Sequence, residues 1–206
     1  MELIGTASTI TELCVKRRIL PFVLTALVFP WAVNSYASEI EVGKKIYDKY
    51  CVKCHGEDGS GSKYGQGLQP KPARDLRTNR LFLSDSELLV VINHGGSLRE
   101  MPNWQYVLND NGLKNTALFV RTLSYSPDLK NGERLFNEKC ALCHASDGVF
   151  KNKWSAPDLD RSALGPNETA RIIRYGVHNT FMYPRESVHT NAEIADIVAY
   201  IQALKK

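Results

Sequence analysis

Two copies of the motif Cys-x-x-Cys-His constrain this 206-residue chain more than any other feature of its sequence. The first copy is Cys51–His55 and the second is Cys140–His144, and the residues around them repeat as well. Gly43 and Gly132 each lie eight positions before the first cysteine of their motif. A motif that recurs together with its flanks indicates an internal duplication. We therefore expect two similar domains, one after the other.

Cys-x-x-Cys-His is the attachment motif of c-type haem. Its two thiols add to the two vinyl groups of the porphyrin, and a spacing of three puts both sulfur atoms on one face of a helical turn. The histidine that follows then points at the iron. We predict two covalently bound haem c groups. The predicted attachment residues are Cys51, Cys54, Cys140 and Cys143, and the predicted proximal iron ligands are His55 and His144.

Other uses of paired cysteines fit this sequence less well. A redox-active Cys-x-x-Cys pair explains neither the histidine in both copies nor the lack of a βαβ pattern. A four-cysteine zinc site usually separates its pairs by about 15–20 residues, whereas Cys54 and Cys140 are 86 positions apart. A disulfide within Cys-x-x-Cys is strained and unusual as a structural bridge.

Methionine is the expected sixth ligand of both irons. Beyond Met1 the chain has only Met101 and Met182, and each lies six positions after a glycine, Gly95 or Gly176, at which a helix is expected to end. Histidine–methionine ligation raises the reduction potential and suits electron transfer. Two alternatives stay open. A methionine can instead fill a gap in the core, or a histidine can replace it as ligand.

The remaining histidines do not repeat between the two halves. For His94 and His178 we expect a surface or supporting role, and for His189 a solvated position in the turn before the last helix. Each proximal histidine needs an acceptor for its second ring nitrogen. The candidate carbonyls belong to Pro70 or Pro72 in the first half and to Pro157 in the second, with an ordinary loop proline as the alternative. We expect Trp104, Tyr106 and Trp154 to pack in the core; lining a haem or a domain interface is the alternative.

The apolar residues around both motifs have helical spacing, and no strand-like alternation stands out. Capping boxes at 84–87 and 190–193 predict helix starts, and residues 167–175 form another expected helix. The stretch 124–130 has turn chemistry and is predicted to be a linker. The fold class is therefore all-α. The predicted division is a signal peptide at 1–37, a first domain at 38–125 and a second domain at 126–206.

The N-terminal segment has the features of an export signal. A basic cluster at 16–18 precedes a mostly apolar run at 19–33, and small residues before Ala37 predict cleavage after it. Export to the periplasm follows, and Cys14 leaves with the signal. The alternative is an uncleaved membrane anchor, which would make the protein a membrane partner. However, the run of about 15 residues is short against the roughly 20 needed to span a bilayer.

Over essentially the whole mature chain, and in both halves, the sequence resembles the class I cytochromes c. The resemblance is carried by Cys51-Val-Lys-Cys-His-Gly, by Met101-Pro-Asn-Trp and by the terminal Tyr200-Ile-Gln-Ala-Leu. It implies two tandem cytochrome c domains, each with a few helices wrapped around one haem and with crossing N- and C-terminal helices, in a bacterial periplasm. Two departures concern the second half. Tyr183 separates Met182 from Pro184, and Ala145 replaces the glycine after the histidine.

The expected function is electron transfer between redox protein partners, without enzymatic activity. A net charge of +4, from 26 basic and 22 acidic residues, gives no reason to expect nucleic acid as a partner. One alternative is the cytochrome subunit of a larger dehydrogenase or reductase complex, which co-purification would reveal. A less favoured alternative is a dihaem peroxidase or a haem sensor, which requires an open iron and would bind carbon monoxide. The sequence does not indicate an oligomeric state.

Overall fold

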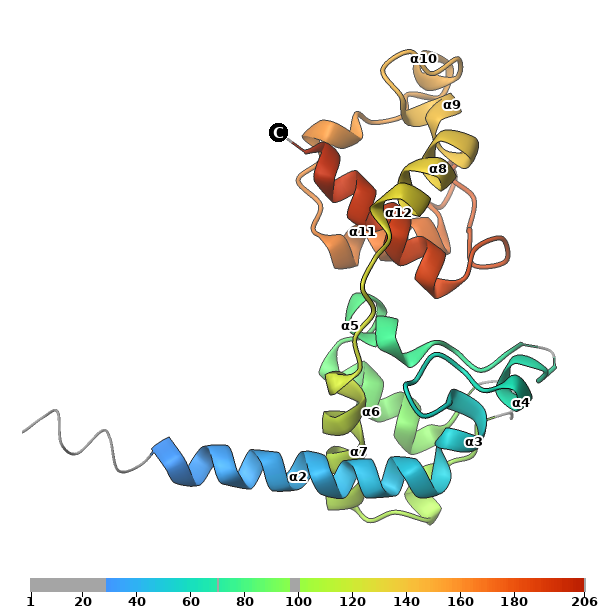
Figure 1. The fold of residues 1–206 in the computed structure, drawn as a ribbon. Coiled ribbons are helices and arrows are strands. Elements are labelled where there is room, and N and C mark those ends of the chain that lie inside the picture. The colour runs from blue at the N-terminus through green and yellow to red at the C-terminus, as the bar shows by residue number, and fades with distance from the viewer. Residues whose placement is uncertain (1–28, 70, 97–100, 206) are drawn as a thin grey trace, which may run out of the picture. The chain divides into compact units, whose positions relative to one another are not determined.

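The structure is a computed structural model that describes residues 29–69, 71–96 and 101–205. Every regular element in these ranges is an α-helix or a 3-10 helix, and they contain no strand (Figure 1). The prediction of an all-α fold is therefore confirmed. Residues 1–28, the greater part of the predicted signal peptide with Cys14, lie outside the described residues, as does Pro70.

The chain divides into two compact units, Met1–Glu39 and Ile40–Lys206. In the first unit, the described residues are the beginning of helix α2 (Phe29–Tyr50). Apart from Ser38 and Glu39, both repeats belong to the second unit, and we call them the first half (38–125) and the second half (126–206). Within the described ranges, no helix combines the length and the hydrophobicity needed to cross a membrane.

The first half places a core of six buried side chains among α2, α6 and α7. Gly43 on α2 lies so close to α7 that a Cβ atom there would overlap the carbonyl oxygen of Asn115. Tyr47 and Phe119 pack across the same crossing, with ring centroids 5.0 Å apart. The elements are α2, α3 (Val52–His55), α4 (Lys63–Gln66), η1 (Leu76–Thr78), α5 (Asn79–Phe82), α6 (Asp85–His94), η2 (Trp104–Tyr106) and α7 (Asp110–Thr122).

The second half repeats this crossing with its own residues. A Cβ atom on Gly132 of α8 would overlap the carbonyl oxygen of Asp196 on α12, and the rings of Phe136 and Tyr200 lie 5.3 Å apart. First and last helices thus cross in each half, as expected from the resemblance. The elements are α8 (Leu129–Lys139), α9 (Ala141–His144), α10 (Lys151–Trp154), η3 (Leu159–Arg161), α11 (Pro166–Tyr175) and α12 (Asn191–Leu204).

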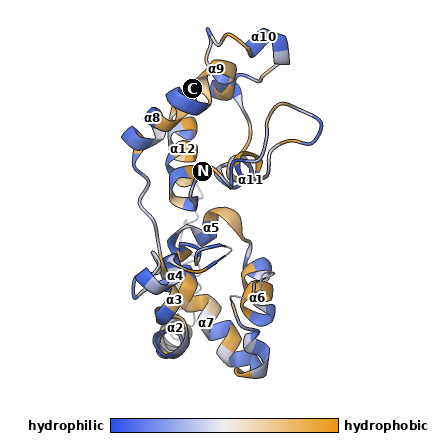
Figure 2. Ribbon diagram, turned by 90° about the vertical axis from the view of Figure 1, so that its right-hand side faces the viewer, coloured by the Kyte–Doolittle hydropathy of each residue, from blue (hydrophilic) through white to orange (hydrophobic). Residues whose placement is uncertain are grey.

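The predicted helix starts and ends are confirmed. Ser84 with Glu87 and Thr190 with Glu193 form reciprocal capping boxes at the starts of α6 and α12. Gly95 and Gly176 end α6 and α11 with φ of 74° and 71°, a conformation that glycine adopts without strain. Hydrophobic residues are frequent along α12 (Figure 2), and α5 contributes Leu81 and Phe82. Phe82 of α5 belongs to the core of the second half.

The segment between α7 and α8 is fastened to the last helix. Asp196 on α12 is 2 % exposed and accepts hydrogen bonds from the Tyr125 hydroxyl (3.0 Å), the Asp128 backbone N–H (2.8 Å) and the Asn131 amide (2.7 Å). Burial, followed by this bond to Asp196, raises the pKa of Tyr125 to about 12, so the phenol stays protonated and can donate. The predicted linker is therefore an ordered connection.

Candidate haem-binding sites

The first Cys-x-x-Cys-His motif forms one helical turn directly after α2. The backbone N–H of Cys51 donates to the carbonyl of Tyr47 (2.8 Å), and that of His55 donates to the carbonyl of Cys51 (2.9 Å). Cys51 and Cys54 are free thiols. Burial raises the pKa of the Cys51 thiol to about 11, and the neighbouring Cys54 adds to the effect. Both cysteines and the histidine therefore come from a single turn, as the spacing predicts.

His55 is held in the orientation that a proximal ligand requires. Its Nδ1 donates a hydrogen bond to the Arg74 carbonyl at 3.1 Å, which leaves the Nε2 lone pair available for a metal. Burial lowers the pKa of His55, against the weaker opposing effect of this hydrogen bond, and so favours the neutral ring. The prediction of a Pro72 acceptor was wrong. The chain passes His55 two residues later, where Arg74-Asp75-Leu76 matches Pro157-Asp158-Leu159 of the second half.

The second motif has the same local geometry. The backbone N–H of His144 donates to the Cys140 carbonyl (2.9 Å), and Nδ1 of His144 donates to the Pro157 carbonyl (3.2 Å). The predicted Pro157 acceptor is therefore confirmed. Cys140 and Cys143 are free thiols. Burial raises the pKa of Cys140 to about 11, although Arg185 nearby acts in the opposite direction.

Both methionines lie half-buried against the core of their own half. The Met101 carbonyl accepts a hydrogen bond from Gly96 N–H (3.2 Å), and the Met182 carbonyl accepts one from Val177 N–H (2.8 Å). Gly96 and Val177 both directly follow the glycine that ends the preceding helix. The two methionine loops therefore have the same backbone relation to their helices.

Three other sequence predictions have different outcomes. His94 and His178 are exposed, in agreement with a surface role. His189 is 7 % exposed, so the prediction of a solvated side chain was wrong. Its backbone N–H donates to the Arg185 carbonyl (2.9 Å), and this turn folds the side chain inward, with Nδ1 3.9 Å from the Glu193 carboxylate.

The aromatic residues divide in a similar way. Trp104 is half-buried and lies 5.3 Å from the ring of Tyr50. Trp154 is half-buried and stacks on Phe150 at 4.3 Å and on Phe181 at 4.6 Å. Tyr106 is 80 % exposed, so its predicted place in the core was wrong. It ends the single turn of η2, a surface element without buried residues.

A cluster of charged residues near Met182 escaped the sequence analysis. Arg174 on α11 is 4 % exposed, and its guanidinium lies over the Phe82 ring at 4.8 Å. Its Nε is 3.5 Å from the Glu186 carboxylate and has no hydrogen-bond partner among the described residues. Lys71 approaches the same carboxylate at 4.0 Å. The sequence offered one signal for this cluster, because Arg174 falls on the apolar side of the helix predicted at 167–175.

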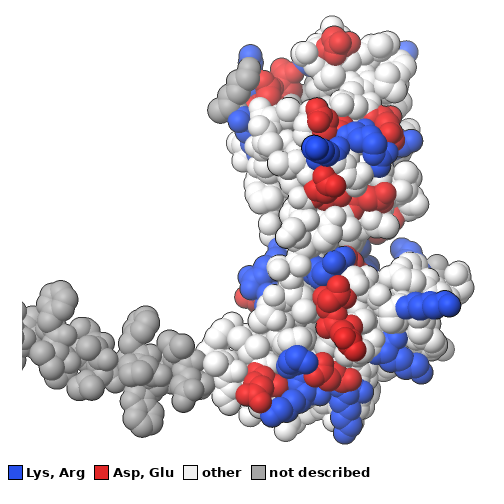
Figure 3. Space-filling view, viewed as in Figure 1, with Lys and Arg blue, Asp and Glu red and all other residues white. Residues whose placement is uncertain are grey.

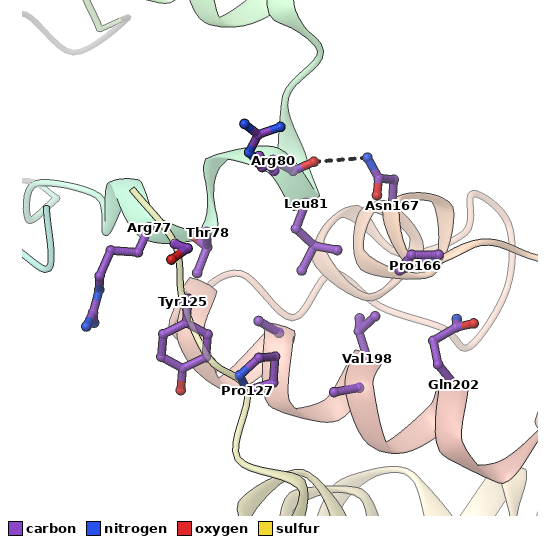
Figure 4. A pocket seen from close by; sticks show the side chains of 13 residues that line it. Arg77, Thr78, Arg80, Leu81, Tyr125, Pro127, Pro166, Asn167, Val198 and Gln202 are labelled. Carbon is purple, nitrogen blue, oxygen red and sulfur yellow. Dashed lines mark hydrogen bonds between the residues drawn. The ribbon is translucent and has the colours of Figure 1, made fainter. Parts of the chain in front are cut away.

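A cavity of about 290 Å³ lies apart from both motifs (Figure 4). Leu81, Tyr125, Pro166 and Val198 contribute to its mainly apolar lining, and Asn167 donates a hydrogen bond to the Arg80 carbonyl at its edge (3.0 Å). Ligand pockets commonly have volumes of roughly 300–1,000 Å³. None of the cysteine, histidine or methionine residues of the predicted haem sites lines this cavity.

The residues of both halves fit a covalently attached haem. Each half has two free thiols on one turn, a histidine whose Nδ1 is hydrogen-bonded to a backbone carbonyl, and a methionine on a loop beside the core. Sulfur, imidazole and thioether are the donor set used by c-type haem with histidine–methionine ligation. In the first half, the carbonyl that orients the histidine belongs to Arg74, a position that the sequence analysis did not select.

Comparison with known proteins gives consistent matches. The family model of cytochrome c oxidase, cbb3-type, subunit III matches residues 38–120 and 127–201. The cbb3-type cytochrome c oxidase subunit FixP of Sinorhizobium medicae is 27 % identical over 132 residues, 58 % of this chain and 44 % of that protein. The subunit CcoP of Azospirillum brasilense is 33 % identical over 87 residues, 42 % of this chain and 29 % of that protein.

A relative with a different name is also similar. The thiosulfate dehydrogenase of Stutzerimonas stutzeri is 27 % identical over 123 residues, 54 % of this chain and 36 % of that protein. The chain thus spans less than half the length of each of these three relatives. The family model, in contrast, matches each half separately and covers more than half of the chain. With two such matches, the chain belongs to the c-type cytochrome family described as cytochrome c oxidase, cbb3-type, subunit III.

Proposed function

We propose that this protein transfers single electrons between redox proteins through two covalently bound haem c groups, one in each half. Cys51, Cys54, Cys140 and Cys143 would attach the two haems, and His55 with Met101 and His144 with Met182 would ligate the two irons. One observation carries the proposal: the same two features recur in each half. The histidine of the motif donates its Nδ1 proton to a backbone carbonyl, and the methionine carbonyl accepts a hydrogen bond from the end of the preceding helix.

Each of these residues has a distinct task in the proposed mechanism. The haem, when bound, supplies a one-electron iron couple. Arg74 and Pro157 hold the proton of each histidine on Nδ1, which orients Nε2 and increases its basicity. Met101 and Met182 would each supply the second protein ligand of an iron and would thereby exclude small ligands. With both axial positions filled, the protein makes and breaks no substrate bond, so we propose that it is not an enzyme.

Partners and location form the second part of the proposal. The relatives named as oxidase subunits favour redox proteins as donor and acceptor, and their names favour membership of a larger complex as a second possibility. On the face shown in Figure 3, basic and acidic side chains are intermixed. This distribution favours weak, transient docking over attraction to a strongly charged partner. Export by cleavage after Ala37 would place the mature chain in the periplasm.

A titration of the reduced, purified holoprotein with carbon monoxide tests the proposal. We expect two haems per chain and no change of the absorption spectrum, since each iron would have both a histidine and a methionine ligand. Met101→Ala and Met182→Ala should each open one iron to carbon monoxide and serve as positive controls. Carbon monoxide binding by the unaltered protein would contradict the carrier proposal and favour a peroxidase, a sensor or a dehydrogenase. Co-purification with a stable partner would favour the subunit alternative.

A further inference from the structure

The methionine loop of the second half differs from that of the first in one respect. Met101 is followed directly by Pro102, whereas Tyr183 separates Met182 from Pro184. The two methionine carbonyls nevertheless accept the equivalent backbone hydrogen bond, from Gly96 and Val177. Because proline restricts the backbone directly after Met101, the second half needs other contacts to hold its methionine in the same place.

One such contact lies directly before Met182. Phe181 stacks on Trp154 of α10, with ring centroids 4.6 Å apart and an interplanar angle of 21°. Trp154 in turn stacks on Phe150 at 4.3 Å and 15°. Stacked aromatic rings attract each other beyond the area that they bury. The residue before Met101 is Glu100, which offers no ring for such a stack.

The other contact lies four residues after Met182. The backbone N–H groups of Arg185 and Glu186 donate to the Arg174 carbonyl at 3.2 and 3.3 Å, and the Glu186 carboxylate lies 3.5 Å from the Arg174 Nε. The Arg174 side chain is 5 % exposed and the Glu186 side chain is 35 % exposed, so water screens this pair only in part.

The first half has no such pair at the corresponding positions, which are occupied by Asn93 and Gln105. Asn93 and Arg174 both lie two residues before the glycine that ends their helix. In the first half, an uncharged amide thus stands where the second half has a buried cation.

We propose that the Phe181–Trp154 stack and the Arg174–Glu186 pair are positioning contacts that hold Met182 on the second iron, where the first half relies on Met101-Pro102. We call these four residues the Met182 anchor. The inference rests on the proposed ligation of the second iron by Met182. Both contacts lie on the loop that carries Met182, one on each side of it, so losing either should increase the population in which Met182 is detached.

Two spectroscopic readouts test the anchor in the holoprotein. The first is the weak absorption band that methionine sulfur gives with ferric haem, and the second is carbon monoxide binding to the reduced protein. The difference spectra of Met101→Ala and Met182→Ala define the contribution of each haem. We expect Trp154→Leu and Glu186→Gln each to increase the detached population at the second haem by roughly threefold to tenfold, in proportion to the strength of one such contact. The double variant should have the larger effect.

Matched substitutions separate positioning from general loss of structure. Trp154→Phe keeps a stacking ring and Arg174→Lys keeps the cation, so each should retain most of the methionine band. Trp104→Leu is the control in the first half. It removes the aromatic residue three positions after Met101 and should leave the methionine band of the second haem unchanged. Retention of the complete band at the second haem in a folded Trp154→Leu/Glu186→Gln double variant would overturn the anchor. Absence of that band from the unaltered protein would instead overturn the ligation by Met182.

Discussion

The two halves of the chain share their framework and differ in their buried polar groups. Gly43 and Gly132 occupy equivalent helix crossings, and Gly95 and Gly176 end equivalent helices. At other equivalent positions the chemistry changes. Asn93, Leu108 and Asn115 of the first half correspond to Arg174, His189 and Asp196 of the second.

This difference separates two kinds of constraint. The close crossing of two helices and the turn that presents two thiols leave little choice of residue, so they recur in both halves. Polar side chains at the edge of a core can differ between the halves, because each half contacts different segments of the chain. Asp196 fastens the linker, and Arg174 packs on Phe82 of the first half, so the second half holds the groups that connect the repeats.

The largest expected effect tests whether each half keeps its own haem. Replacing Cys140 and Cys143 together by alanine should reduce the haem content from two to one per chain and leave the first haem's spectrum in place, because the first half builds its site from its own helices. Mass spectrometry of the intact chain and the pyridine haemochrome spectrum measure this content. Replacing Cys51 and Cys54 by alanine is the reciprocal control. Loss of both haems from either variant would show that the halves depend on each other.

The next largest effect concerns the shared helix crossings. Gly43→Ala and Gly132→Ala should each destabilise the folded chain by about 3 kcal/mol, because the new Cβ overlaps a backbone carbonyl that cannot move freely. Denaturant unfolding of the holoprotein measures the change. Gly67→Ala is the control, since a Cβ there meets its nearest neighbours at ordinary contact distances of 3.5 Å or more. Equal stability of all three variants would mean that the helices at both crossings can separate enough to accept a Cβ atom.

A smaller effect is expected where the halves differ. Asp196→Ala should cost roughly 2 kcal/mol of unfolding free energy, because it removes the acceptor of three hydrogen bonds around the linker. Asn115→Ala is its counterpart in the first half and should cost less, since among the described residues the Asn115 side chain makes no hydrogen bond to the linker. Thermal unfolding of both variants measures the difference. A larger loss of unfolding free energy in Asn115→Ala than in Asp196→Ala would contradict the view that the buried polar contacts of the second half stabilise the connection.

Local patterns in the sequence predict much of this architecture. The capping box at Ser84 and the turn at Cys51 depend on residues within a few positions of each other, and both are confirmed. The Pro157 acceptor is also confirmed, because a proline in the loop after the motif indicates where the chain turns beside His144. These features need no knowledge of tertiary contacts.

Contacts that depend on the detailed path of a loop are beyond the same reasoning. The acceptor for His55 is Arg74 rather than Pro72, because the longer first loop changes where the chain passes the histidine. The pairing of Arg174 with Glu186 depends on how the methionine loop returns to α11. A charged residue such as Arg174 would be predicted from sequence to be exposed. The fold instead buries its side chain and places the Glu186 carboxylate beside it.

The smallest expected effect is a dependence of stability on pH that arises from His189. Burial lowers its pKa below the ordinary value of 6.5, and Arg185 and Lys139 act in the same direction against Glu193. Below about pH 6.5 the unfolded chain therefore binds more protons than the folded chain at this site, and stability falls as the pH decreases towards the folded-state pKa.

His189→Gln should remove this contribution, and the corresponding position of the first half, Leu108, cannot titrate. The free energy of unfolding of both proteins, measured by denaturant titration between pH 7 and pH 5, checks the expectation. The difference between them should change with pH in favour of the variant at the acidic end. A constant difference would mean that His189 titrates alike in the folded and unfolded chains. The second half would then hold a buried histidine whose surroundings leave its pKa at the ordinary value.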